Sequence, residues 1–250
     1  MDSRAFLLEE MAWPEAKEAL KSARLGLVPV GSLEQHGPHL GMAADAVQSY
    51  EFTKRLAAAV YPKAVMTAPI AFGVSAHHMA FPGTVSIRPD TLIALAEDIA
   101  LSLTRHGITH VLFVNGHGGN QNALGVATER LRFEHGVKAA HCLWPMLGWL
   151  EGMQAASSKR VGHSCELEVS MVMHLSPRHV KTDRLTDGEF IDAPLRHTSP
   201  FGIAVPRAFD EITANGAFEG APKARPELGE IIVKAALGRI VEFIEDFLRT

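Results

Sequence analysis

Residues 109–135, THVLFVNGHGGNQNALGVATERLRFEH, pass from a short apolar run through a glycine-rich turn into a longer, more polar segment. The run Thr109–Val114 is apolar on both faces, which indicates a buried strand of a parallel sheet. The glycines of the turn let the backbone approach its neighbours closely. The segment Asn120–His135 is predicted to be a helix that ends at Gly136. Residues 109–135 are thus predicted to form a strand, a glycine-rich turn and a helix.

The same alternation recurs along the chain. Further strands are predicted over Leu25–Gly31, Ala64–Ile70 and Val137–Leu143. Further helices are predicted over Ala46–Val60, Asp90–Arg105, Glu166–Leu175 and Glu230–Leu248. Alternation of this kind favours a three-layer α/β domain with a mainly parallel sheet. Residues 178–227, the least regular part, are interpreted as long loops and short strands of the same single domain, 1–250.

Composition narrows the class of protein. The 250 residues are 47% hydrophobic and 21% charged, which is typical of a globular chain with a sizeable core. A net charge of −4 gives no support for nucleic-acid binding. The N-terminus lacks a signal-peptide pattern, and no apolar run is long enough to predict a membrane span. With only two cysteines, a cytoplasmic location in a reducing environment is expected.

Acidic and histidine side chains gather where predicted strands end. Glu34 and His36 follow the first strand, and their spacing of two points both side chains to the same side of an extended segment. Asp45 begins the next helix, and His117 lies in NGHGGN (115–120) after the third strand. In open α/β sheets, ligands bind beyond the carboxyl ends of the strands. These positions therefore predict a common site at that edge.

A third acidic segment, GHSCELEVS (162–170), brings Glu166 and Glu168 to the start of a helix. Taken alone, this segment fits ordinary helix capping. Taken alone, the segment with Glu34 and His36 fits a solvated turn, and NGHGGN fits a glycine-rich turn. Together, histidines and carboxylates form a ligand set for Zn²⁺, Mn²⁺ or Fe²⁺. Several carboxylates can hold two cations about 3.5–4 Å apart, which activate a water molecule. The combination favours a metal site over three unrelated turns.

Four segments resemble the creatininase family of metal-dependent amidohydrolases. They are GSLEQHGPHLGMAAD (31–45), SAHHMAFPGT (75–84), NGHGGN (115–120) and HSCELEVS (163–170). The resemblance runs in order over nearly the whole chain. It implies a creatininase-like three-layer α/β/α fold and two divalent metal ions, Zn²⁺ or Mn²⁺ with Fe²⁺ in some relatives. It also implies a homo-oligomer, either a hexamer or a dimer-based assembly.

The resemblance also implies a ligand set, matched position by position. The four strongest metal positions, with Asp45 as the bridge, are Glu34, His36, Asp45 and His117. In creatininase another acid follows two residues after the histidine of the third motif, where this chain has Gly119. An acid from the later segment is therefore expected to complete the centre. Both Glu168 and Glu166 are candidates for this last ligand, and Glu168 is slightly favoured.

Other positions are candidates for catalysis and substrate binding. His163 matches a histidine expected to shuttle protons, and Glu166 or Glu168 is an alternative proton donor. Ser75 and His78 match a substrate-facing loop. Gly118 takes the place of an aromatic substrate contact of creatininase, which weighs against creatinine as the substrate. Two tryptophans after the fourth strand, Trp144 and Trp149, are candidates either for pocket walls or for core packing.

The sequence thus predicts a metal-dependent amidohydrolase that breaks a C–N bond of a small cyclic or related amide with a metal-activated water. A small-molecule amide is the expected partner, with no nucleic acid and no membrane. Two rival reactions use the same centre: deformylation of a pyrimidine intermediate, and trimming of a modified peptide. A rival of another class is a non-catalytic metal-binding subunit.

Overall fold

The structure is a computed structural model that describes residues 4–191 and 205–250. Its centre is a five-stranded parallel sheet in the order β1-β3-β2-β4-β5. The strands are β1 (Phe6–Leu7), β2 (Leu25–Val30), β3 (Ala64–Met66), β4 (His110–Asn115) and β5 (Lys138–Leu143). The predicted α/β fold with a mainly parallel sheet is confirmed.

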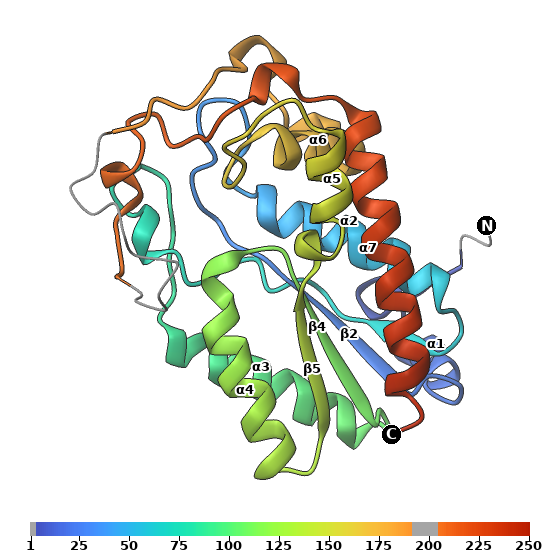
Figure 1. Cartoon of the computed structure of the whole chain (residues 1–250). Coiled ribbons are helices and arrows are strands. Elements are labelled where there is room, and N and C mark those ends of the chain that lie inside the picture. Colours follow the sequence, from blue (N-terminus) through green and yellow to red (C-terminus); the bar gives the residue numbers. More distant parts are fainter. Residues whose placement is uncertain (1–3, 192–204) are drawn as a thin grey trace.

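Helices cover both faces of this sheet (Figure 1). They are α1 (Trp13–Ala19), α2 (Ala44–Ala59), α3 (Pro89–Arg105), α4 (Gln121–Phe133), α5 (Trp149–Ala155), α6 (Glu166–Leu175) and α7 (Pro226–Phe247). Helices α3 and α4 pack on one face, and α2, α6 and α7 pack on the other. Within the described residues, no helix combines the length and the apolar character that crossing a membrane needs.

Alternation along the central strands builds the two apolar layers. Leu27 and Leu112 point into the layer with α2, α6 and α7, whereas Val28, Val111 and Phe113 point into the layer with α3 and α4. All five side chains are buried. Burying each of them stabilises the fold by roughly 1.5–3 kcal/mol. A strand that is buried on both faces consists of a continuous run of apolar residues. This pattern predicts β2 and β4 from the sequence.

The register of the two central strands sets the position of the site. Val30 of β2 pairs with Asn115 of β4, so both strands end at the same level. The loops that follow them therefore leave the sheet side by side. This is the carboxyl edge, where a ligand site was expected.

Two predicted boundaries differ from the structure for clear reasons. The second predicted strand ends at Met66 rather than at Ile70, because Pro69 has no N–H to continue the ladder. Ile70 returns to the sheet only through a single bridge to Val30. The last helix begins at Pro226 rather than at Glu230, since proline is favoured in the first turn. Residues 192–204 of the predicted irregular region lie outside the described residues.

Candidate metal centre

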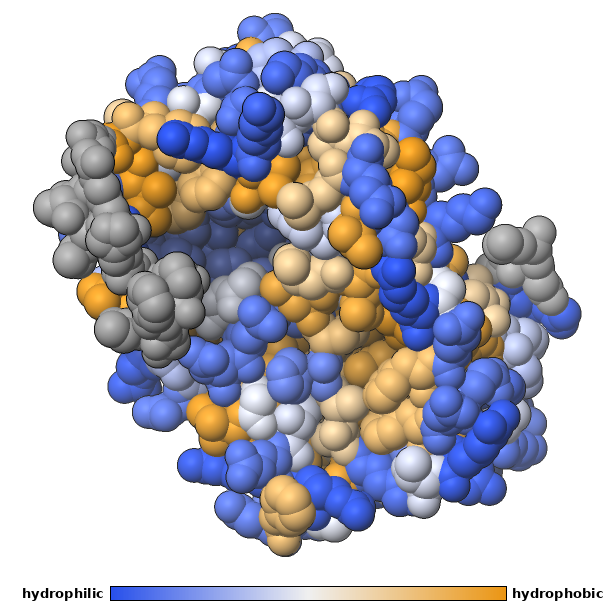
Figure 2. Space-filling model, viewed as in Figure 1, coloured by the Kyte–Doolittle hydropathy of each residue, from blue (hydrophilic) through white to orange (hydrophobic). Residues whose placement is uncertain are grey.

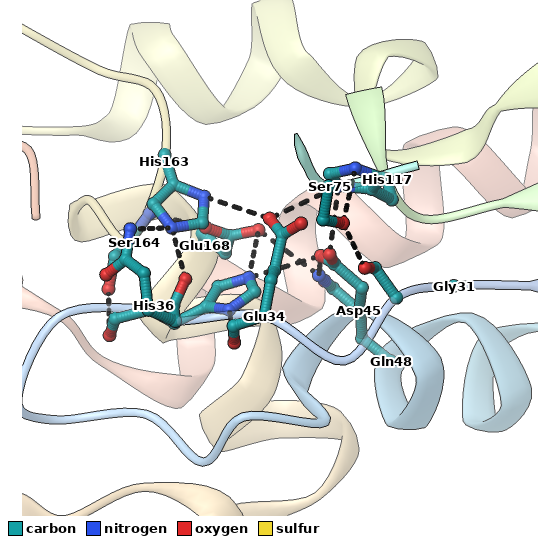
Figure 3. A network of polar contacts seen from close by, with 12 residues as sticks. Gly31, Glu34, His36, Asp45, Gln48, Ser75, His117, His163, Ser164 and Glu168 are labelled. Atoms are coloured by element: carbon teal, nitrogen blue, oxygen red, sulfur yellow. Dashed lines mark hydrogen bonds and ion pairs between the residues drawn. The ribbon is translucent and has the colours of Figure 1, made fainter. Parts of the chain in front are cut away.

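Four chain segments bring acids and histidines together at the carboxyl edge of the sheet (Figure 3). Glu34 and His36 lie on the loop after β2, and His117 lies on the loop after β4. Asp45 and Glu168 lie in the first turns of α2 and α6. The dipole at a helix N-terminus favours negative charge there, which supports both carboxylates. The structure thus gathers five of the six residues considered as ligands.

Asp45 stands between the two histidines. Its Oδ2 is 3.1 Å from His117 Nδ1, and its Oδ1 is 3.2 Å from His36 Nε2. On one side, Glu34 Oε1 lies 3.2 Å from His117 Nδ1. On the other side, Glu168 Oε1 lies 3.8 Å from His36 Nε2. The arrangement is two groups of potential metal ligands that share one aspartate.

Backbone carbonyls orient both imidazole rings. His117 Nε2 donates a hydrogen bond to Val74 O at 3.1 Å, and His36 Nδ1 donates to Glu34 O at 3.1 Å. A carbonyl oxygen only accepts, so these nitrogens carry the protons. The opposite nitrogens, His36 Nε2 and His117 Nδ1, face the carboxylates and can hold either a proton or a cation there. This orientation by a second hydrogen bond is typical of metal-binding histidines.

The electrostatics of the cluster favour added positive charge. Glu34 Oε1 and Oε2 and Asp45 Oδ2 are buried and accept no hydrogen bond within the described part of the chain. Burial lowers the pKa of His36, but the carboxylates of Asp45 and Glu168 outweigh it and raise that pKa to about 10. Buried acceptors of this kind are costly unless a proton or a cation satisfies them. With imidazole nitrogens beside them, they fit Zn²⁺, Mn²⁺ or Fe²⁺.

Glu166 and Glu168 point in different directions, since two residues on a helix are about 200° apart. Glu168 lies in the cluster and accepts a hydrogen bond from Gln48 Nε2 at 3.2 Å. Glu166 instead accepts the backbone N–H groups of Ser157 and Ser158, at 3.1 and 2.8 Å. Its carboxylate therefore holds the loop that precedes α6, and the structure does not bring Glu166 to the ligand cluster.

This difference gives a paired prediction. Glu168→Gln is expected to weaken metal binding about 10-fold or more, because a ligand oxygen becomes an amide. Glu166→Gln is expected to leave metal binding unchanged and to lower the free energy of unfolding by about 1–3 kcal/mol, since one of the two buried acceptor oxygens that bind Ser157 N and Ser158 N becomes an NH₂ group. Metal titration and urea unfolding of both proteins separate the two effects. Loss of metal from Glu166→Gln alone would contradict the assignment.

Gly119 explains why no acid follows His117 here. A Cβ atom at Gly119 would lie 2.2 Å from Val74 O and 2.5 Å from His117 Nε2. Any side chain would collide with the groups that orient His117. The position therefore requires glycine, and Glu168 supplies the fifth side chain from another element.

Two further histidines flank Glu34. His163 Nε2 donates to Gln35 O at 2.7 Å, and its Nδ1 lies 3.8 Å from Glu34 Oε1. His78 Nδ1 accepts from Gln35 Nε2 at 2.9 Å, and its Nε2 lies 3.3 Å from Glu34 Oε1. Burial is the largest cause that lowers both pKa values, that of His78 to about 3 and that of His163 well below its ordinary value. Both rings are therefore neutral, and His163 Nδ1 has a free lone pair.

A cavity of about 290 Å³ opens over the cluster. Figure 2 shows the hollow with a hydrophilic floor and hydrophobic residues around it. The polar wall contains four cluster residues, Glu34, Asp45, His117 and Glu168, together with His77, His78 and His163. The apolar wall is formed by Leu143, Pro145, Met146, Trp149, Met171 and Phe209. Lysine and arginine are absent from the described lining residues.

The predicted substrate-facing residues divide into two groups. Gly118, His78 and Trp149 line the cavity. Trp144 is fully buried and stacks on Phe52 with ring centroids 4.2 Å apart, so core packing explains it. Ser75 is also buried, and its hydroxyl contacts Ser32 Oγ and His117 Nε2. Ser75 thus supports a ligand, and it is not among the lining residues of the cavity.

Sequence reasoning missed some residues of the site. Gln48 contacts both Asp45 and Glu168, and its spacing of three from Asp45 on one helix face could have revealed it. Phe209 packs against His78 with ring centroids 4.4 Å apart. It comes from the irregular region, where no periodicity marks it. Met146 lies on the apolar wall without any motif of its own.

Comparison with known proteins settles the family. The family model described as Creatininase: Creatinine amidohydrolase matches residues 9–244. The chain belongs to the creatininase family. A solved structure described as creatininase Mn superposes on 98% of this chain and 99% of its own, with a TM-score of 0.80 and 26% identity. The predicted resemblance is therefore confirmed.

Two relatives of this chain carry different names. The mycofactocin precursor peptide peptidase of Mycolicibacterium smegmatis is 38% identical over 178 residues, which are 70% of this chain and 66% of that protein. The match thus spans just under two thirds of that relative. The creatinine amidohydrolase of Pseudomonas putida is 25% identical over 98% of both chains. Proteins named for different substrates therefore resemble this chain.

Proposed function

We propose that this protein is a metal-dependent hydrolase that breaks the C–N bond of an amide. One observation carries the proposal: the two oxygens of Asp45 face His36 and His117, with Glu168 and Glu34 on the outer sides. These five side chains would hold two divalent cations. When bound, such ions supply an activated water and a Lewis acid for the amide carbonyl. The manganese named in the related creatininase structure supports this choice of metal.

The protein's own residues supply the remaining chemistry. His163 Nδ1 faces the cluster with a free lone pair, so it can accept a proton and return it to the leaving nitrogen. Gln35 O holds the opposite nitrogen and keeps the ring in place. Trp149 and Phe209 on the apolar wall exclude bulk water from the reacting group. A proton donor other than Glu166 is favoured, since Glu166 bonds to Ser157 and Ser158.

Peptide trimming is the second candidate. It is favoured by the 38% identity to a peptidase, against 25% to a creatinine amidohydrolase. Gly118 leaves open space where a side chain would stand. An open position there suits a substrate larger than a small ring. Assembly into a homo-oligomer and a cytoplasmic location stay predictions.

Elemental analysis followed by a hydrolysis screen tests the proposal. The purified protein is expected to contain about two equivalents of zinc, manganese or iron. It should then hydrolyse at least one member of a panel of lactams, formamides and short peptides. Formate release identifies a deformylase, a shortened peptide identifies a peptidase, and ring opening identifies a lactam hydrolase. Tight metal binding without any turnover would support a non-catalytic metal-binding subunit instead.

A further inference from the structure

Three loops around the cluster meet at one buried amide, Asn120, the last residue of the glycine-rich motif. Its Nδ2 donates to Gly31 O at 3.0 Å, on the loop that leads to Glu34. Its Oδ1 accepts from Val74 N at 2.8 Å, on a second loop. Its Nδ2 also donates to Asn115 Oδ1 at 3.1 Å, at the end of β4. Every donor of this side chain is used, and its burial is complete.

Asn115 extends the network to the backbone of His117. Asn115 Oδ1 accepts from His117 N at 3.0 Å, and Asn115 Nδ2 donates to His117 O at 2.6 Å. Both backbone groups of His117 are thus held by one side chain. Because Asn120 in turn donates to Asn115 Oδ1, it sets the orientation of that amide. The position of the His117 backbone therefore depends on Asn120.

The second loop controls the His117 ring. Val74 donates its N–H to Asn120 and presents its carbonyl oxygen to His117 Nε2 at 3.1 Å. Holding Val74 N therefore aligns Val74 O with the ring. That contact leaves His117 Nδ1 facing Glu34 and Asp45. Asn120 thus acts on the ring and on the backbone of the same histidine.

We propose that Asn120 is a positioning residue that sets the metal affinity of the site by fixing His117. The proposal rests on the metal-dependent function proposed above. A shorter side chain at position 120 could not join the three loops. An aspartate would keep the acceptor for Val74 N but would turn an oxygen toward Gly31 O and Asn115 Oδ1. A Cβ at Gly73 would lie 2.7 Å from Asn120 Oδ1, so glycine there makes room for the amide.

The experiment compares Zn²⁺ binding by the wild type, Asn120→Ala and Asn120→Asp. The matched control is Thr128→Val, which also removes buried hydrogen bonds, to Leu124 O and Gly125 O, on α4. Each Asn120 variant is expected to bind Zn²⁺ about 10–100-fold more weakly. The control is expected to stay within about twofold of the wild type. Melting temperatures of all four metal-free proteins show how much stability each change removes.

A spectroscopic measurement separates positioning from general destabilisation. In imidazole ¹H–¹⁵N spectra of the Zn²⁺-loaded wild type, the His117 Nε2 proton is expected to exchange slowly, because Val74 O binds it. In either Asn120 variant this proton should exchange faster, whereas Thr128→Val should leave it unchanged. An Asn120 variant that folds and keeps wild-type Zn²⁺ affinity overturns the proposal. If the wild type binds no Zn²⁺, Mn²⁺ or Fe²⁺, the metal-dependent function fails instead.

Discussion

Asp45→Asn is expected to lower amide hydrolysis by about 10²–10³-fold and to reduce the bound metal below one equivalent. Among the described carboxylates, Asp45 lies within ion-pair distance of both histidines, with Oδ2 3.1 Å from His117 Nδ1 and Oδ1 3.2 Å from His36 Nε2. An amide of the same shape presents one oxygen and one NH₂ group, so only one side keeps a ligand. Elemental analysis and the rate with the best substrate of the screen measure both effects.

The matched control for this prediction is Asp90→Asn. Asp90 also lies in the first turn of a long helix, but it is exposed and outside the cluster. Asp90→Asn is expected to keep the full rate and the full metal content. An Asp45→Asn protein with two metals and an unchanged rate would rule out Asp45 as the bridge. Equal losses in both variants would point to a helix effect rather than to a lost ligand.

Removal of the metal ions with a chelator is expected to destabilise the folded protein by about 4 kcal/mol. This figure corresponds to free metal at about 1,000 times its dissociation constant. For a chain of this size the melting temperature should fall by roughly 8–16 °C. The physical cause is the group of buried oxygens on Glu34 and Asp45 that accept no hydrogen bond within the described residues. Without a cation these carboxylates repel one another in a buried site.

Calorimetry with and without chelator measures this shift, and adding back Mn²⁺ or Zn²⁺ should reverse it. Asp45→Asn serves as the internal control, because a protein that has lost its bridging ligand should respond little to the chelator. The same melting temperature for the wild type with and without chelator would contradict a buried metal centre. A shift of equal size in Asp45→Asn would place the metal elsewhere in the protein.

Much of the fold and part of the site were predictable from local patterns. The apolar runs of β2 and β4 indicated buried parallel strands, since both faces of each strand pack against helices. The rule that ligands bind beyond the carboxyl ends of such strands then predicted where Glu34, His36 and His117 would meet. The rule applies here because Val30 pairs with Asn115, so β2 and β4 end at the same level of the sheet.

Short elements and sheet edges were not predictable in this way. β1 has two residues, and α5 has seven, so both are shorter than the window of about 11–18 residues in which periodicity becomes a reliable signal. α5 nevertheless brings Trp149 to the cavity, because the helix packs against α7 from the far end of the chain. Trp144, five residues earlier, is buried against Phe52 of α2. Spacing along the chain does not distinguish these two tryptophans.

The chain's local patterns were thus enough to establish a parallel α/β sheet and the region where acids and histidines gather. They left the choice between Glu166 and Glu168 open, because both belong to the same turn of one helix. Packing of α6 resolves it: Arg225 and the loop at Ser157 engage Glu166, while Gln48 of α2 engages Glu168. The hydrogen-bond partners of these two glutamates lie 8–120 positions away in the sequence. The direction of each glutamate side chain therefore depends on contacts that exist only after those segments have packed together.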